Sequence, residues 1–172
     1  MKKFILVLVL AVLVAGAVFA DRPSGFGIGA MGQTQGWGWK GFVYTETYGL
    51  AVSLKIPSVP IFWGVHLYFY KGSLAVGVSG DYYLIDKTII PSVNFGWYFG
   101  LGAYAGVNLK SGSFDIHAAA RLPVGLYIIP VDFLEVYFAV VPHLGVAVAI
   151  NPIGVNFPYG GLGAEIGIRF WF

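Results

Sequence analysis

Apolar and polar side chains alternate along most of this chain with a period of two. Between residues 134 and 148, the apolar positions begin with Leu134, Val136 and Phe138, and the positions between them hold Glu135 and other polar or small residues. Successive side chains of a β-strand point to opposite faces. The alternation therefore predicts a strand with one apolar face and one polar or small face.

The same period recurs often enough to predict eight strands. They cover residues 25–33, 49–56, 61–70, 74–81, 95–109, 115–128, 134–148 and 162–172. Short links rich in Pro, Gly, Ser and Asp are expected at residues 57–60, 71–73, 86–91, 111–113 and 130–132. Longer links are expected at residues 34–44 and 151–159. Proline lacks an amide hydrogen and suits strand ends. The links therefore favour an antiparallel circuit in which each strand neighbours the next.

The composition decides which medium the apolar face contacts. Hydrophobic residues make up 58% of the chain and charged residues only 10%, whereas soluble domains carry about 25% charged residues. A soluble β-sandwich or lipocalin-like barrel would need a solvated polar face, but the polar face here is rich in Gly and poor in Lys and Glu. A helical membrane protein is disfavoured because the longest helical candidate, residues 128–150, contains Pro130, Asp132 and Glu135. Strands in lipid must pair every backbone amide. The predicted fold is therefore all-β, a transmembrane up-and-down antiparallel β-barrel of eight strands.

The first 20 residues have the features of a cleaved signal peptide. Lys2 and Lys3 form a positively charged start, an apolar run covers Phe4 to Phe19, and cleavage is expected after Ala20, a small residue suited to it. The run is shorter than the roughly 20 residues of a membrane-spanning helix, so a retained anchor is the weaker alternative. We predict a signal peptide at 1–20 and a barrel at 21–172. The predicted location is the outer membrane of a diderm bacterium.

The C-terminal residues follow the pattern of a barrel assembly signal. Such signals place a Gly before two aromatic residues at the end of the last strand, and Gly167, Phe170 and Phe172 fit this spacing. An ordinary amphipathic strand would also contain Phe170 and Phe172. The terminal aromatic residue together with a signal peptide favours the assembly signal. The barrel assembly machinery, which reads such a strand by pairing with it, is then an expected partner beside the outer-membrane lipids.

Outward-facing aromatic residues are expected near one end of the barrel. They are Trp63, Tyr82, Phe95 and Trp97, followed at the C-terminus by Phe170 and Phe172. Aromatic girdles of this kind lie at the membrane–water interface and fix the height of a barrel in the bilayer. A site that stacks a ligand is the weaker interpretation.

Several short motifs resemble a known family. They are Leu54-Lys55-Ile56-Pro57, Phe62-Trp63-Gly64, Asp81-Tyr82-Tyr83, Arg121-Leu122-Pro123-Val124-Gly125-Leu126 and the closing Gly-x-Arg-aromatic-x-Phe of residues 167–172. Across residues 50–172 the chain resembles the small outer-membrane β-barrel family of spirochaetes. The resemblance implies an eight-stranded barrel of the general kind found in OmpX and the OmpA transmembrane domain. It implies no agreed activity.

Six charged residues fall on the inward face of the predicted barrel. They are Lys55, Asp81, Arg121, Glu135, Glu165 and Arg169. An eight-stranded barrel has room inside for side chains only, and an isolated buried charge is costly, so each should find a partner. We expect Arg121 and Arg169 to interlock with Glu135, Glu165 and Asp81, and Tyr127 and Tyr137 to fill the remaining gaps. Such a network would plug the lumen.

The sequence offers no catalytic constellation. A lipid A deacylase on this scaffold sets a His two residues before a nucleophilic Ser, and none of the three His residues has that Ser. Ser79 near Asp81 is the best alternative nucleophile, with no assignable His. His117 is expected opposite Gly145, diagonally close to His143. With Asp115 these two could begin a metal site, but a hydrogen-bonded lumen pair is favoured. We expect no enzyme activity, no cofactor and no metal.

The charge balance also limits the function. Without Lys2 and Lys3 the chain has eight basic and eight acidic residues and no basic cluster, so nothing supports nucleic-acid binding. The favoured function is a structural outer-membrane protein of the cell envelope with a closed, side-chain-filled lumen. A narrow pore or transport protein is one alternative. The other is a surface-exposed adhesin or host-factor binder that acts through the two longer loops on an unknown extracellular ligand.

Overall fold

The computed structural model describes residues 22–38, 44–70, 73–110 and 112–172. Within these residues the chain forms nine strands, β1 (Gly27–Gly38), β2 (Tyr44–Lys55), β3 (Phe62–Tyr70), β4 (Ser73–Ile90), β5 (Phe95–Lys110), β6 (Ser113–Arg121), β7 (Val124–Val131), β8 (Leu134–Ile150) and β9 (Ile153–Trp171). A short 3-10 helix, η1 (Pro91–Val93), lies between β4 and β5. None of the helices in this described part of the chain has the length and hydropathy needed to cross a membrane. The predicted signal peptide lies outside the described residues.

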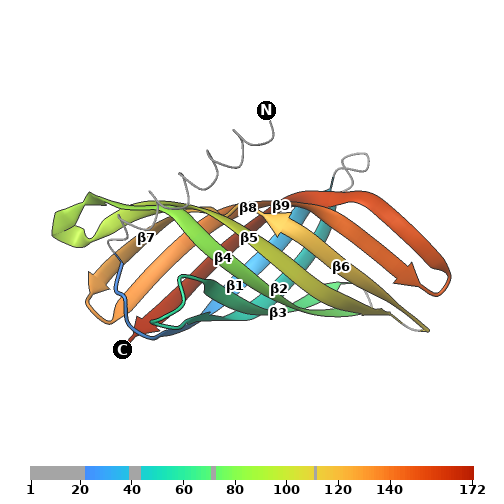
Figure 1. The fold of residues 1–172 in the computed structure, drawn as a ribbon, viewed down its shortest axis with the longest axis horizontal. Coiled ribbons are helices and arrows are strands. Elements are labelled where there is room, and N and C mark those ends of the chain that lie inside the picture. The colour runs from blue at the N-terminus through green and yellow to red at the C-terminus, as the bar shows by residue number, and fades with distance from the viewer. Residues whose placement is uncertain (1–21, 39–43, 71–72, 111) are drawn as a thin grey trace.

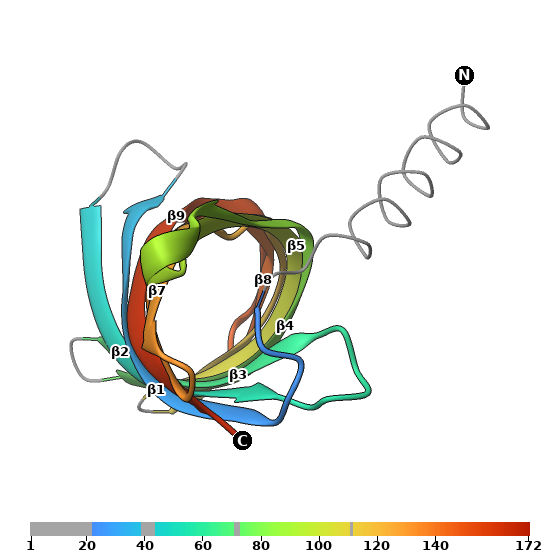
Figure 2. The same cartoon turned by 90° about the vertical axis from the view of Figure 1, so that its left-hand side faces the viewer.

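The strands form one closed antiparallel ring. From β1 to β5 each strand pairs with the next, and β1 also pairs with β9, which closes the circuit. Both β6 and β7 pair with β5 on one side and with β8 on the other, so they are two pieces of a single barrel strand. The ring therefore has eight strands, which confirms the predicted fold class, and Figure 2 shows it end-on.

The break between β6 and β7 falls at Leu122 and Pro123. Proline cannot donate to a strand ladder, but the backbone around it stays bonded to both neighbours. Leu122 N donates to Pro142 O at 2.9 Å, and Gly100 N donates to Pro123 O at 2.8 Å. The ring is therefore continuous across the break. The sequence analysis predicted one strand at residues 115–128, and β6 and β7 together take its place between β5 and β8.

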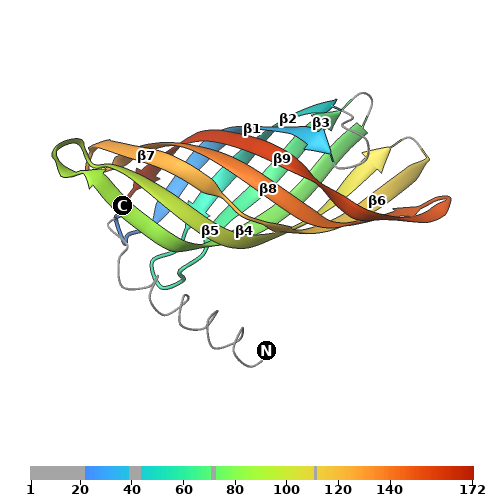
Figure 3. The ribbon, with the colours of Figure 1, turned by 90° about the horizontal axis from the view of Figure 1, so that it is seen from above.

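Both ends of the described chain meet at one end of the barrel, which we call the proximal end (Figure 1). There Phe26 and Phe172 exchange backbone hydrogen bonds of 3.0 and 2.8 Å. The links β2–β3, β4–β5 and β7–β8 lie at the same end, and the links β3–β4, β5–β6 and β8–β9 lie at the opposite, distal end. Figure 3 shows that the β8–β9 hairpin extends beyond the other strands distally.

The predicted loop at residues 151–159 is wrong. β8 continues to Ile150 and β9 begins at Ile153, so only a two-residue turn separates them. Pro158 in this stretch falls where the pairing shifts register, between the Gly145–Tyr159 and Ala147–Asn156 pairs. A bulge accepts a residue that cannot donate to the ladder, so the hairpin accommodates this proline.

Two other boundaries also differ from the prediction. Residues 86–90 of the expected link at 86–91 belong to β4, and Pro91 begins η1. Lys87 therefore lies in a strand opposite Trp97, and two register shifts in the β4–β5 ladder explain why the alternation was lost there. At the expected loop of residues 34–44, β1 runs to Gly38 and β2 starts at Tyr44. Residues 39–43 lie outside the described residues.

The two faces of the ring differ in polarity. On β9, Ile166 and Ile168 are 60% and 43% exposed on the outside, whereas Glu165 and Arg169 are 8% and 1% exposed inside. Charged side chains inside and aliphatic ones outside reverse the arrangement of a water-soluble barrel. The alternation in the sequence correctly predicted which face of this strand is which.

Aromatic rings in the lumen pack against glycines of neighbouring strands. A Cβ atom on Gly125 would overlap the ring of Tyr98 and lie 2.5 Å from the backbone oxygen of Phe138. A Cβ atom on Gly167 would lie 2.6 Å from the ring of Tyr137. Both tyrosines are almost fully buried. The glycines on the inward face therefore provide the space that the rings occupy.

We expect Gly125→Ala to lower the free energy of unfolding by roughly 1–3 kcal/mol, the typical cost of forcing extra atoms into a packed interior. Gly154→Ala is the matched control, because a Cβ atom there would meet nothing within 4 Å. Urea titration of the refolded barrel, followed by its heat-modifiable gel shift, measures both. Equal midpoints for the two variants would contradict the packing argument.

Candidate functional site

Buried charges in the lumen gather in two clusters. The first, which we call the proximal cluster, is centred on Glu135 of β8, whose side chain is completely buried. Its Oε2 atom accepts hydrogen bonds from Arg169 Nη1 at 2.9 Å and from Trp171 Nε1 at 3.0 Å. Its Oε1 atom lies 3.4 Å from Nη2 of Arg22. One carboxylate thus ties β9 and the segment before β1 to β8.

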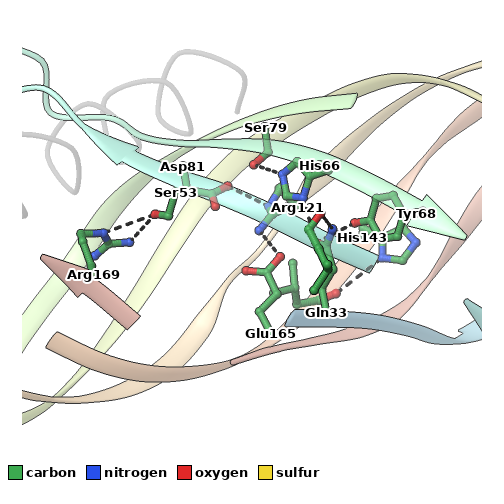
Figure 4. A network of polar contacts seen from close by, with 12 residues as sticks. Gln33, Ser53, His66, Tyr68, Ser79, Asp81, Arg121, His143, Glu165 and Arg169 are labelled. Carbon is green, nitrogen blue, oxygen red and sulfur yellow. Dashed lines mark hydrogen bonds and ion pairs between the residues drawn. The ribbon is translucent and has the colours of Figure 1, made fainter. Parts of the chain in front are cut away.

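Arg169 uses the rest of its guanidinium to reach across β1 to β2. Its Nε and Nη2 atoms donate to Ser53 Oγ of β2 at 3.3 and 2.8 Å, a contact drawn in Figure 4. Its Cζ atom lies 4.7 Å from the centre of the Phe62 ring and 4.9 Å from that of Tyr137. The planar guanidinium both donates in fixed directions and stacks on rings, so Arg169 crosslinks the lumen.

Arg22 is a member of this cluster that the sequence analysis missed. It precedes β1, and its Cζ atom lies 4.1 Å from the centre of the Tyr127 ring and 4.3 Å from that of Tyr98. It pairs with Asp86 and Glu135, each at 3.4 Å, but none of its side-chain nitrogens forms a hydrogen bond within the described chain. The two carboxylates and the faces of the tyrosine rings together compensate the burial of this cation.

The central cluster is built around Arg121 of β6 (Figure 4). Arg121 Nη2 donates to Glu165 Oε1 at 2.7 Å, and Arg121 Nε lies 2.9 Å from Asp81 Oδ1. The three residues come from β6, β9 and β4, and all are buried. This arginine therefore links three strands from inside the ring.

Lys55 stands apart from the other predicted lumen charges. Its Nζ atom donates to the backbone oxygens of Ile56 and Val59 at 2.9 and 2.8 Å. It therefore binds the turn between β2 and β3, and the structure gives it no carboxylate partner among the described residues. The other five predicted residues fall into the two clusters rather than one continuous network.

His66 connects Ser79 to Gln33 in the wall of the lumen. His66 Nε2 lies 2.7 Å from Ser79 Oγ, and His66 Nδ1 lies 2.8 Å from Gln33 Oε1. Because Gln33 Oε1 can only accept, Nδ1 carries the proton and Nε2 accepts from the serine hydroxyl. The expectation that Ser79 has no His is thus wrong, since the β3–β4 register places Gly64 opposite Ser79 and His66 diagonally beside it.

This arrangement resembles a nucleophile with its base, but its surroundings do not suit catalysis. Ser79 and His66 are 2% and 1% exposed, so a substrate carbonyl has no access to the serine oxygen. The group that orients the histidine is a neutral amide, which cannot stabilise an imidazolium as a carboxylate does. The three residues therefore form a satisfied polar wall between β1, β3 and β4.

A cavity of about 550 Å³ occupies the distal half of the lumen. It extends from Arg121 and Glu165 of the central cluster to Ser73 and Gly154, next to the distal hairpins. The prediction of a lumen filled throughout by side chains is therefore wrong for this half. Its inward positions hold many Ala and Gly residues, which do not reach across the barrel.

Two of the three His residues line this cavity. The predicted pairing of His117 with Gly145 is wrong by two residues. His117 lies opposite Ala147, and His143 lies opposite Arg121. The ring of Tyr159 contacts both, with centroids 4.9 Å from His117 and 6.1 Å from His143. Within the residues described, no three His, Asp or Glu side chains gather closely enough to hold a metal ion.

The predicted assembly signal and girdle lie mostly at the proximal end. Gly167 faces inward on β9, while Phe170 and Phe172 are exposed on the outside. Trp63, Phe95 and Trp97 lie near the proximal ends of β3 and β5 and are at least partly exposed. Tyr82 lies in the middle of β4, further from the rim than expected. Their roles stay predictions.

No protein-family model and no curated protein matches this sequence. Among solved structures, the chain is similar to Neisserial surface protein A (NspA), with a TM-score of 0.54 and 13% sequence identity over 87% of this chain and 98% of that one. The chain has the fold of an outer-membrane β-barrel. At this low identity the likeness to NspA shows the fold alone. The resemblance to the spirochaete family stays a prediction.

We expect Arg121→Ala to destabilise the barrel by roughly 3–5 kcal/mol, because it leaves Asp81 and Glu165 buried without their cation. Lys87→Ala is the control, since it removes a cation from an exposed position of β4 and should cost under about 1 kcal/mol. Urea unfolding of both refolded variants tests this. A midpoint for Arg121→Ala that equals that of Lys87→Ala would show that the central cluster contributes nothing.

Proposed function

We propose that this protein is a structural component of a bacterial outer membrane, with its barrel spanning the bilayer and no catalytic activity. The observation that carries the proposal is the outer surface of the ring. Every strand presents an apolar side chain that is at least 39% exposed: Ile28, Leu50, Val65, Val76, Leu101, Ile116, Leu126, Phe138 and Ile168. Water-soluble proteins rarely expose continuous apolar surface beyond a few hundred Å². Lipid is the medium that would cover it.

The closed ring supports the same proposal. A strand in hydrocarbon cannot leave its amide and carbonyl groups unpaired, and only a closed sheet satisfies all of them. The pairing of β1 with β9 leaves no free edge. By analogy with known barrels, the proximal end, where both ends of the described chain lie, would face the periplasm and the distal hairpins would face outward.

The proximal half of the lumen explains why a pore is the weaker candidate. Arg22, Arg169 and Glu135 cross it, and the rings of Tyr98 and Tyr127 fill the space around them, each at most 6% exposed. A hydrated ion would have to displace paired charges to pass. The distal cavity therefore ends on a packed floor.

A surface-exposed binder is the second candidate. The β8–β9 hairpin projects distally and carries Ile153, Val155 and Phe157, which are 85%, 69% and 71% exposed. Exposed apolar side chains on a projecting hairpin favour contact with a lipid or a partner. The hairpin takes the place of one of the two loops from which such binding was expected.

The mature protein should begin at Asp21 and fractionate with the outer membrane. Mass spectrometry of the N-terminal peptide and density-gradient separation of the two membranes measure this, and a folded barrel should show a heat-modifiable gel shift. A chain lacking residues 1–20 is the control and should remain in the cytoplasm. Retention of residues 1–20, or recovery in the inner membrane, would contradict the proposal.

The purified barrel should show no porin-sized conductance in a planar lipid bilayer. The proximal cluster and its tyrosines block the lumen, so the current should stay at the baseline of the bilayer. A general porin reconstituted under the same conditions serves as the positive control. Stable openings of porin size would reject the plugged barrel and favour the transport alternative.

A further inference from the structure

The segment before β1 lies at the proximal mouth of the lumen. We call residues 22–25 the strap, and Figure 2 shows this segment in blue at the mouth of the ring. Regular pairing starts only at Phe26, which exchanges backbone hydrogen bonds with Phe172. Within the described part of the chain, the strap forms no backbone–backbone hydrogen bond, and the side chain of Arg22 is its one polar attachment.

The site that receives Arg22 combines aromatic rings with carboxylates. The Cζ atom of Arg22 lies 4.1 Å from the centre of the Tyr127 ring and 4.3 Å from that of Tyr98. Asp86 Oδ2 and Glu135 Oε1 each lie 3.4 Å from a guanidinium nitrogen. We call the two tyrosines and two carboxylates, which come from β4, β5, β7 and β8, the arginine seat. Aromatic faces together with carboxylates are the groups that recognise a guanidinium.

Arg22 leaves much of the hydrogen-bonding capacity of this seat unused. Within the described chain, none of its side-chain nitrogens donates a hydrogen bond, and the fully buried Oε1 atom of Glu135 accepts none. Unmade hydrogen bonds between buried charged groups are costly. The short strap fixes the direction from which the guanidinium of Arg22 approaches the carboxylate. A guanidinium that is free of the chain can instead turn to form the paired hydrogen bonds that a carboxylate accepts best.

We propose that the arginine seat is a binding site for a ligand with an alkylguanidinium group, and that the strap is its internal competitor. Arg22 occupies the seat in the unliganded barrel. The ligand enters from the proximal end, takes the place of the Arg22 guanidinium and releases the strap, while the Phe26–Phe172 pair keeps β1 joined to β9. The seat lies inside the barrel, so binding in detergent does not depend on the membrane in which the protein resides.

Arg22→Ala empties the seat and isolates the binding step. Isothermal titration calorimetry of this folded variant in detergent should show one-to-one binding of n-propylguanidine, which has the alkyl chain and head group of an arginine side chain. The wild-type protein should bind it at least about tenfold more weakly, because the ligand must displace a tethered competitor. N-propylurea, a neutral molecule of similar shape, should bind neither protein. Absence of propylguanidine binding to Arg22→Ala, or equally tight binding of propylurea, would overturn the proposal.

Two further changes, each made in the Arg22→Ala protein, locate the binding. Asp86→Asn removes one carboxylate of the seat and should weaken propylguanidine binding about tenfold or more, as expected for loss of a charge-assisted contact. Asp132→Asn removes the carboxylate of an exposed residue in the β7–β8 turn at the same end of the barrel and should leave binding unchanged. Each variant must first show the gel shift of a folded barrel. Equal loss of binding in the two would indicate non-specific attraction and overturn the proposal.

A spin label on the strap tests displacement in a protein that keeps Arg22 and its seat. The chain contains no Cys, so Ser24→Cys creates a single labelling site at an exposed position of the strap. Propylguanidine should raise the mobility of this label over the concentration range in which it binds the wild-type protein. The same label introduced by Ser58→Cys, in the exposed β2–β3 turn, should not respond. Unchanged mobility of the strap label at every ligand concentration that leaves the barrel folded would show that Arg22 is a permanent part of the fold and overturn the proposal.

Discussion

Pairing of the first strand with the last is the contact on which the rest of this structure depends. β1 and β9 are joined from the Gly27–Trp171 pair to the Gly38–Gly161 pair, and this ladder turns an eight-stranded sheet into a ring. A ring has no free edge, so its backbone polar groups are satisfied without water. The outer face can then be largely apolar, and most charged side chains of the strands point into the lumen.

Confinement within so small a ring sets the chemistry of the lumen. Charges there lose most of their hydration, and the residue at the centre of each cluster is held by partners from different strands. Glu135 accepts hydrogen bonds from Arg169 and Trp171 and forms an ion pair with Arg22, and Arg121 forms ion pairs with two carboxylates. Breaking such a group leaves an uncompensated charge. These contacts therefore couple distant strands, which the backbone ladder, acting only between neighbours, cannot do.

The lumen is divided because large and small inward side chains are segregated along the barrel axis. In the proximal half, tyrosine rings lie over glycines and enclose two guanidinium groups. In the distal half, Ala and Gly at inward positions leave the cavity of about 550 Å³. The same scaffold thus combines a packed proximal half with an open distal half.

The sequence by itself determined the number of strands in the ring and which side of each strand is apolar, because period-two alternation is a local consequence of backbone geometry. Residues 162–172 illustrate this, with Ile166 and Ile168 outside and Arg169 inside. The tertiary structure alone decided which inward residues meet. Ser79 pairs with His66, and His117 faces Ala147 rather than Gly145. Arg22 enters the lumen although it precedes β1, and the β8–β9 hairpin passes through Pro158 by a bulge. Register, bulges and inserted ends depend on contacts between segments far apart in the chain, which no local pattern encodes.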